Sequence, residues 1–157
     1  KIPKGVDDGT RIRVSGKGEA GTKGGSNGDL YLFVSIDNHE IFKRAEENLY
    51  YELPISFTDA ALGTSVEVPS IDGGKSKIKI PSGTQHGKQF RLKGKGMPIL
   101  RRNLFGDLYI RINTQVPNSL SKRQKEILEE FGEIEKNKPD PIIKNFFEKA
   151  KKFWKSS

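Results

Sequence analysis

Two short motifs have the residue types of a chemical site. Residues 16–21, Gly-Lys-Gly-Glu-Ala-Gly, have the glycine spacing of a dinucleotide-binding loop. That chemistry needs a helix that begins at the last glycine, because its first amides bind the pyrophosphate. Residues 22–28 are too rich in glycine to form such a helix, and the related segment 94–98 lacks the third glycine. We therefore interpret the match as fortuitous.

A second candidate site is formed by Asp37, His39 and Glu40, which carry metal-ligating side chains within four residues. Three ligand types this close in a loop more often form a hydrogen-bonded turn than a metal centre. The chain has no cysteine, which excludes thiolate zinc sites, disulfides and a cysteine nucleophile. No serine has a plausible base beside it in sequence. We expect a non-enzymatic protein without a metal or cofactor in this chain, in a reducing compartment such as the cytoplasm.

The positive charge is concentrated at the end of the chain. The net charge is +8, but residues 136–157 contain seven lysines against Asp140 and Glu148, which leaves +3 for the first 135 residues. The arginines and lysines of residues 11–17 and 91–95 alternate with apolar residues, which is typical of a solvated strand face. We therefore do not expect nucleic-acid binding, although a nucleic-acid-binding β-domain stays open as an alternative. No apolar run is long enough to cross a membrane.

The elements that position these residues are organised as an internal repeat. At an offset of 78 residues, 12 of the 30 positions from Ile2 to Tyr31 are identical to those from Ile80 to Tyr109, without a gap. The matched glycines fall at turn positions, where a positive φ favours glycine. This pattern indicates a duplication, and the first copy is predicted to be incomplete because residues 39–79 have no counterpart before Lys1. We accordingly expect the chain to be the end of a longer protein.

Between the two matches, residues 49–57 alternate as a half-buried strand, and Pro54 within them predicts a sheet edge. Residues 58–63 predict one capped helical turn, and Ser65–Pro69 and Lys75–Ile80 predict a hairpin. The fold class predicted is mainly β: tandem small antiparallel β-sandwich domains, the first one truncated, followed by C-terminal helices. The predicted ranges are 1–38 for the first domain, 39–117 for the second, and 118–135 and 136–157 for two helical segments.

The two helical segments carry apolar stripes. Ser121 predicts a capped helix to about Gly132, whose stripe is Ile127, Leu128 and Phe131. Asp140-Pro141 predicts the start of a second helix, with isoleucine, phenylalanine and tryptophan on one face and lysines mostly on the other. This basic helix could dock within a dimer, lie on an anionic membrane or fold against a partner, and we favour the first.

Together these segments resemble the C-terminal, client-binding region of the DnaJ family of J-domain co-chaperones, over residues 1 to about 131. The resemblance rests on the segments that the sequence shares with that region: Ile-Pro-x-Gly and Gly-Asp-Leu-Tyr in both repeats, residues 16–21, residues 39–44 (His-Glu-Ile-Phe-Lys-Arg), residues 60–63 (Ala-Ala-Leu-Gly), residues 94–98 (Gly-Lys-Gly-Met-Pro) and the helix opening at Leu120-Ser121.

The resemblance implies a homodimer that holds unfolded polypeptides in shallow apolar grooves and delivers them to a DnaK-type chaperone. The chain lacks the family's His-Pro-Asp motif and its four Cys-x-x-Cys zinc motifs. Stimulation of the partner ATPase and zinc binding are therefore expected of absent parts of a parent protein. Neither nucleic acid nor a membrane is expected as a partner, with a membrane-peripheral protein using its basic tail as the other alternative.

The family motif implies that Leu32, in the strand after Gly28-Asp29, lines the first groove, and the repeat carries this role to Ile110. Strand alternation adds the residues that share their faces, and the strand at 49–57 adds further candidates for the second domain: Leu30, Val34, Ile36, Leu108, Ile112, Tyr51, Leu53 and Ile55. The competing interpretation is that all of them are ordinary sandwich core. For Ile127, Leu128 and Phe131 the family implies a dimer seam, and the alternative is packing on their own domain.

Overall fold

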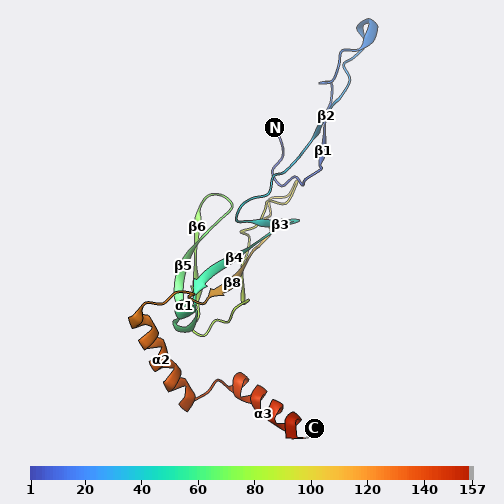
Figure 1. Cartoon of the computed structure of the whole chain (residues 1–157). Helices are drawn as coiled ribbons and strands as arrows, with labels where there is room; N and C mark the ends of the chain where they lie inside the picture. Colours follow the sequence, from blue (N-terminus) through green and yellow to red (C-terminus); the bar gives the residue numbers. More distant parts are fainter. Residues whose placement is uncertain (156–157) are drawn as a thin grey trace. The chain divides into compact units, whose positions relative to one another are not determined.

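The computed structural model describes residues 1–155, which divide into a β unit over residues 1–116 and a helical unit that begins at Pro117. Figure 1 shows the elements in chain order. They are β1 (Arg11–Val14), the short 3-10 helix η1 (Thr22–Gly24), β2 (Leu30–Phe33), β3 (Lys43–Ala45), β4 (Asn48–Ser56), α1 (Phe57–Leu62), β5 (Thr64–Pro69), β6 (Lys75–Ile80), β7 (Gln89–Leu92), β8 (Leu108–Gln115), α2 (Lys122–Asn137) and α3 (Pro141–Lys155).

The strands form a four-stranded sheet in the order β3-β4-β8-β7 and two hairpin-like pairs, β1-β2 and β5-β6. The predicted mainly β class, with antiparallel strand pairs and C-terminal helices, is confirmed. One pairing differs, because β4 and β8 run parallel, with Tyr51 opposite Ile110. The strands are more than fifty residues apart, so no turn signal could have indicated this pairing.

The core lies between the four-stranded sheet and the β5-β6 pair (Figure 1). The alternation in β4 buries Leu49, Tyr51 and Ile55, and the parallel neighbour β8 adds three more side chains to the same layer. The predicted hairpin forms the facing layer, to which it contributes Val68, Ile78 and Ile80. The two layers therefore seal the inner face of β8.

The sheet edge predicted at Pro54 is confirmed. β3 pairs only with residues 48–50 of β4, and no further strand among the described residues pairs with residues 51–56 on that side. The Leu49 amide donates to the Asp107 carbonyl at 2.9 Å, toward β8. Because backbone amides alternate between the two sides of a strand, the missing donor of Pro54 falls on the open side.

α2 and α3 begin where the sequence predicts, α1 begins one residue earlier than predicted, and α2 ends later. Ser56 caps α1, and Gly63 closes it with a φ of 82°. Ser121 and Gln124 form a reciprocal capping box at α2, which continues past Gly132 to Asn137. A glycine inside a helix weakens it without ending it, which explains the longer helix.

The two copies of the repeat share one hydrogen-bond frame. Asp29 Oδ1 accepts from the Gly16 amide at 3.0 Å, and Asp107 Oδ1 accepts from the Gly94 amide at 2.8 Å. Gly16 and Gly94 have nearly identical φ values of 69° and 70°. β1 and β2 coincide with β7 and the first half of β8 at the same offset of 78 residues. The duplication is therefore confirmed, whereas the domain boundaries predicted at residues 38 and 135 stay predictions.

Candidate functional site

In the first copy, an apolar sheet face is open to solvent. Leu30 and Leu32 of β2 are 42% and 41% exposed, and Val34 is half-buried. The antiparallel register places Leu32 opposite Ile12 and Leu30 opposite Val14. Cross-strand partners share a face, so these four side chains form one surface, which we call the open face: Ile12, Val14, Leu30 and Leu32.

Ile12 and Val14 are half-buried and were missing from the predicted set. Their own alternation with Arg11 and Arg13 is the signal that could have found them. The described residues contain no strand beside β2 that corresponds to β4 beside β8. The open face is thus the accessible version of a surface that is sealed in the second copy.

The groove predicted in the second copy is absent at Leu108, Ile110 and Ile112, so their predicted contact with a client is wrong. Each of these side chains has 0% exposure, because β4 pairs along β8 and the β5-β6 pair covers the same face. A side chain without accessible surface cannot contact a bound polypeptide. The competing interpretation, that they are ordinary core, holds for these three residues.

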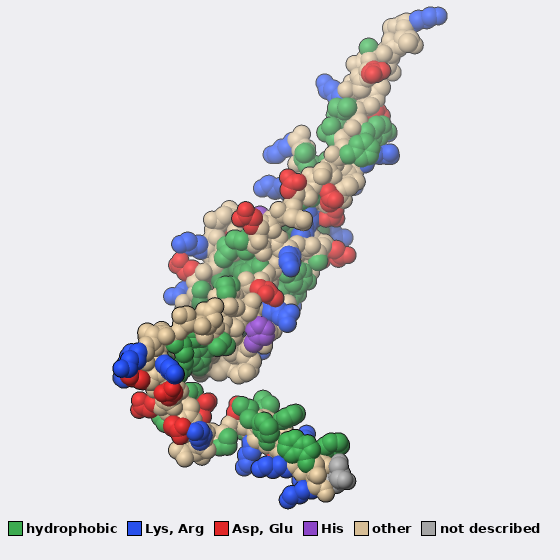
Figure 2. Space-filling view, viewed as in Figure 1, with side chains coloured by type: hydrophobic (Ala, Val, Ile, Leu, Met, Phe, Trp, Pro, Cys, Tyr) green, Lys and Arg blue, Asp and Glu red, His purple; other side chains and the backbone are tan. Residues whose placement is uncertain are grey.

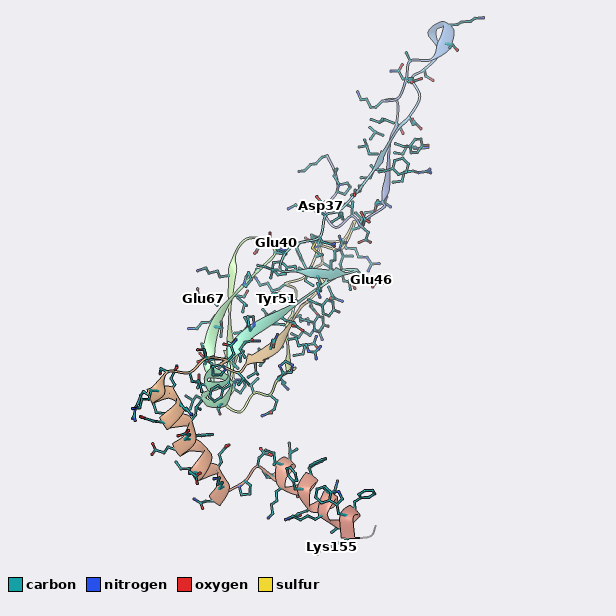
Figure 3. The ribbon with its side chains drawn as sticks, viewed as in Figure 1. Asp37, Glu40, Glu46, Tyr51, Glu67 and Lys155 are labelled. Carbon is teal, nitrogen blue, oxygen red and sulfur yellow. The ribbon has the colours of Figure 1, made fainter. Side chains whose placement is uncertain are left out.

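Tyr51 is also a core residue rather than a lining residue. Tyr51 is 6% exposed, and its hydroxyl donates to the Pro69 carbonyl at 3.5 Å. Figure 3 labels Tyr51 on β4. Burial raises the pKa of Tyr51 to about 12. Ile55 is buried as well, whereas Leu53 is half-buried at the margin of the core. Leu53 is therefore the predicted β4 residue that keeps accessible surface.

A cavity of about 1010 Å³ lies where the first copy meets the second copy. Ile36, Phe42 and Met97 contribute apolar side chains to its lining. Arg44 holds Gly5 and Val6 in the cavity lining. Its guanidinium donates to the Val6 carbonyl at 2.7 Å and to the Gly5 carbonyl at 3.3 Å. The same guanidinium pairs with Asp7. These partners are nearly forty residues apart, so the local sequence contains no signal for the cavity.

The two motifs considered first have structural roles. His39 Nδ1 accepts from the amides of Ile41 and Phe42 at 3.1 and 3.3 Å, so residues 39–42 form the predicted hydrogen-bonded turn. Residues 22–24 form only the three-residue η1, and its flanking glycines are extended. Among residues 1–155 there is no group of three or more side chains that could hold a metal ion.

The strand-face arginines are paired internally, which supports their interpretation as solvated strand faces. Arg91 Nε donates to Asp107 Oδ2 at 2.6 Å, and Arg13 lies 3.7 Å from Asp29 at the equivalent position. The hydrogen bond from the Gly94 amide, followed by the hydrogen bond and charge of Arg91, holds the pKa of Asp107 below its ordinary value, although desolvation acts in the opposite direction. These two arginines are therefore partly neutralised.

The stripe of α2 is exposed within the single chain. Ile127 and Phe131 are about half exposed, and Leu128 is half-buried. Ile134, 63% exposed, extends the stripe by one more turn and was missed because the helix was predicted to end at Gly132. We call these four residues the α2 stripe. No helix of the described residues is long and apolar enough to cross a membrane.

Comparison with known proteins finds matches along both the β unit and the helical unit. The family described as DnaJ C terminal domain matches residues 1–117, and the family described as Chaperone protein DnaJ C-terminal region matches residues 123–156. The chain is 68% identical over 155 residues to the chaperone protein DnaJ of Pelagibacter ubique and 54% identical over 153 residues to that of Brucella anthropi. These two matches span 99% and 98% of this chain, but only 41% of the length of each relative. The chain belongs to the DnaJ C-terminal domain family.

Proposed function

We propose that this chain is the polypeptide-binding and dimerisation part of a DnaJ-type co-chaperone. In this proposal the open face holds unfolded polypeptides, the α2 stripe joins two copies, and the dimer delivers its clients to a DnaK-type chaperone. The role is non-enzymatic and cytoplasmic. Zinc binding and stimulation of the partner ATPase belong to other parts of the longer protein. The accessible surface of Leu30 and Leu32, whose equivalents in the second copy are sealed, is the observation that carries the proposal.

The chemistry of an unfolded chain suits this surface. Such a chain presents extended backbone and scattered apolar side chains, so a shallow apolar face beside a strand edge can bind many sequences. Burial of about 200 Å² of apolar client surface contributes about 5 kcal/mol at ~25 cal/mol per Å², before ordering costs reduce it. The net affinity is weak, and weak binding lets a client leave for the next chaperone.

Replacing Leu32 by serine should weaken client holding. The hydroxyl removes apolar surface from the centre of the open face without removing a core contact, because Leu32 is 41% exposed. We expect the concentration that halves the aggregation of a model client, followed by light scattering, to rise by about threefold or more, as expected for ~0.7 kcal/mol of lost burial.

The matched control for that experiment is Phe33→Ser. Phe33 neighbours Leu32 on the opposite face of β2 and is 75% exposed. We expect the Phe33→Ser variant to suppress client aggregation at nearly the same concentration as the parent chain. If Leu32→Ser behaves like the parent while both variants keep the parent's circular dichroism, the open face does not hold clients.

Replacing Leu128 and Phe131 together by aspartate should convert the dimer to a monomer. The two charges would be buried without partners in an interface formed by the α2 stripe. Sedimentation equilibrium of the full chain measures the mass directly. Lys122→Asp, on the opposite side of α2, is the control and should remain dimeric. An unchanged mass for the double variant would remove α2 from the dimer contact.

A further inference from the structure

The last helix, α3, has a broad apolar face that is exposed to solvent in the single chain. Its isoleucine and aromatic side chains recur at helical spacing and are all more than half exposed; they are Ile142, Ile143, Phe146, Phe147, Phe153 and Trp154. Figure 2 shows apolar side chains on one face of α3 and lysines on the other. We call these six residues the α3 face. An apolar surface of this kind on a soluble domain marks a contact site.

Lysines border the α3 face on both sides. Lys149 lies three residues after Phe146, and Lys151 lies three residues before Trp154, so each is adjacent to the face. α3 contains five lysines and a single acidic residue, Glu148. Its surroundings therefore favour an apolar partner with an acidic border.

The α2 stripe has this chemistry. Glu130 lies three residues after Ile127, and Glu135 lies four residues after Phe131, so both carboxylates are adjacent to the stripe. The ion pairs of α2 involve Glu126, Glu129 and Glu133, and none among the described residues includes Glu130 or Glu135. The stripe and its border thus complement the α3 face in both hydrophobicity and charge.

Among the described residues, the α2 stripe of the same chain does not cover the α3 face. Only residues 138–140 separate the two helices, yet α2 and α3 make no extensive contact with each other among residues 1–155. Both apolar surfaces remain exposed in the single chain. We propose that the α3 face of each copy packs on the α2 stripe of a second copy, with Lys149 and Lys151 beside Glu130 and Glu135.

This proposal deepens the proposed function, because it rests on dimerisation through α2 and adds α3 as the element that covers the stripe. In a two-fold symmetric dimer each chain donates one α3 and receives one, so the contact forms twice. The two α2 helices and the two α3 helices then enclose a common apolar interior. In it, the α2 stripe of each chain is covered by the α3 face of the other chain.

Charge reversal in the full-length 157-residue chain tests the pairing. One variant carries Glu130→Lys and Glu135→Lys, so that both of its helices are basic; the other carries Lys149→Glu and Lys151→Glu, so that both are acidic at the contact. Each variant alone should dimerise with a dissociation constant raised by roughly tenfold or more, because like charges meet at both contacts. An equimolar mixture should form heterodimers with nearly the parent's affinity, measured by sedimentation equilibrium with one variant fluorescently labelled.

Glu129→Lys in α2 and Lys155→Glu in α3 are the controls, because both residues lie on the sides away from the apolar surfaces. They should dimerise like the parent. The heterodimer rescue separates contact between chains from a hairpin within one chain, since a hairpin would be disrupted equally in the mixture.

Three outcomes would overturn the inference. Variants that dimerise like the parent would show that α3 does not cover α2. The proposed dimer contact through α2 would then still be tested separately, by the double aspartate variant of Leu128 and Phe131. Absence of rescue in the mixture would exclude the reciprocal contact. Flotation of the parent with phosphatidylglycerol vesicles, lost in the Lys149→Glu, Lys151→Glu variant without a change in self-association, would assign α3 to a membrane surface instead.

Discussion

Replacing Gly106 by alanine should disrupt the second copy of the repeat. A Cβ atom at Gly106 would lie 2.0 Å from the Glu47 carbonyl oxygen and 2.5 Å from its carbon. Both are backbone atoms next to β4, so no side-chain rotation can make room. The Gly106 amide and carbonyl also bond Met97 and Gly96 at 2.9 Å, which ties the loop in place. We expect the free energy of unfolding to fall by about 3 kcal/mol or more, at the upper end of overpacking costs.

The repeat supplies the control for this substitution. Gly28 is the equivalent residue in the first copy, and a Cβ there would meet only the Glu19 carbonyl oxygen, at 3.8 Å. Neither glycine has a positive φ, so steric crowding alone separates the two sites. Thermal unfolding followed by circular dichroism should show a midpoint about 10 °C lower for Gly106→Ala and little change for Gly28→Ala. Equal midpoints would mean that β4 does not approach Gly106 as described.

A second matched pair distinguishes core from accessible surface. Ile110→Ala should lower the free energy of unfolding by about 2–5 kcal/mol, because Ile110 is fully buried between β4 and the β5-β6 pair and its truncation leaves a cavity. Leu32→Ala, at the equivalent position, should cost less than about 1 kcal/mol, because its side chain is 41% exposed. Urea unfolding of both variants measures the difference directly.

The same two positions also separate stability from function. Ile110→Ala should impair client holding only at temperatures or urea concentrations where its fold is lost. Leu32→Ser, the variant of the aggregation assay, should impair client holding while the chain is folded. If Ile110→Ala unfolds like the parent, β8 is not covered as the structure describes. If both positions lose client holding at full stability, the second copy contains a groove after all.

The duplication could be predicted from the sequence because it depends on glycines and aspartates whose roles are local. Gly16 and Gly94 need a positive φ, and Asp29 and Asp107 bond amides thirteen residues away, so each copy carries its own frame. Local signals also predicted the β5-β6 hairpin and the capped helix starts. They are set by residues close in sequence, and the structure confirms them.

Whether each apolar face is buried or exposed could not be predicted from such local signals. Leu32 and Ile110 occupy the same repeat position and follow the same alternation, so periodicity assigns them the same environment. Their burial depends on β4, which pairs with β8 across more than fifty residues of sequence, and on the layer that the β5-β6 pair adds. The anchoring of Gly5 and Val6 by Arg44 is equally long-range. Alternation shows that a face is apolar, but only the tertiary pairing shows whether another layer covers it.

The position of Pro54 has a consequence for self-assembly. A strand from another chain could extend a sheet at an unpaired edge, and growth of the sheet would start there. Along residues 51–56 the open side of β4 presents the amides of Glu52 and Ser56, with Pro54 interrupting the row between them. Consecutive donors are what fibril-like stacking requires. Pro54 therefore disfavours extension of the sheet along this edge by a strand of another chain.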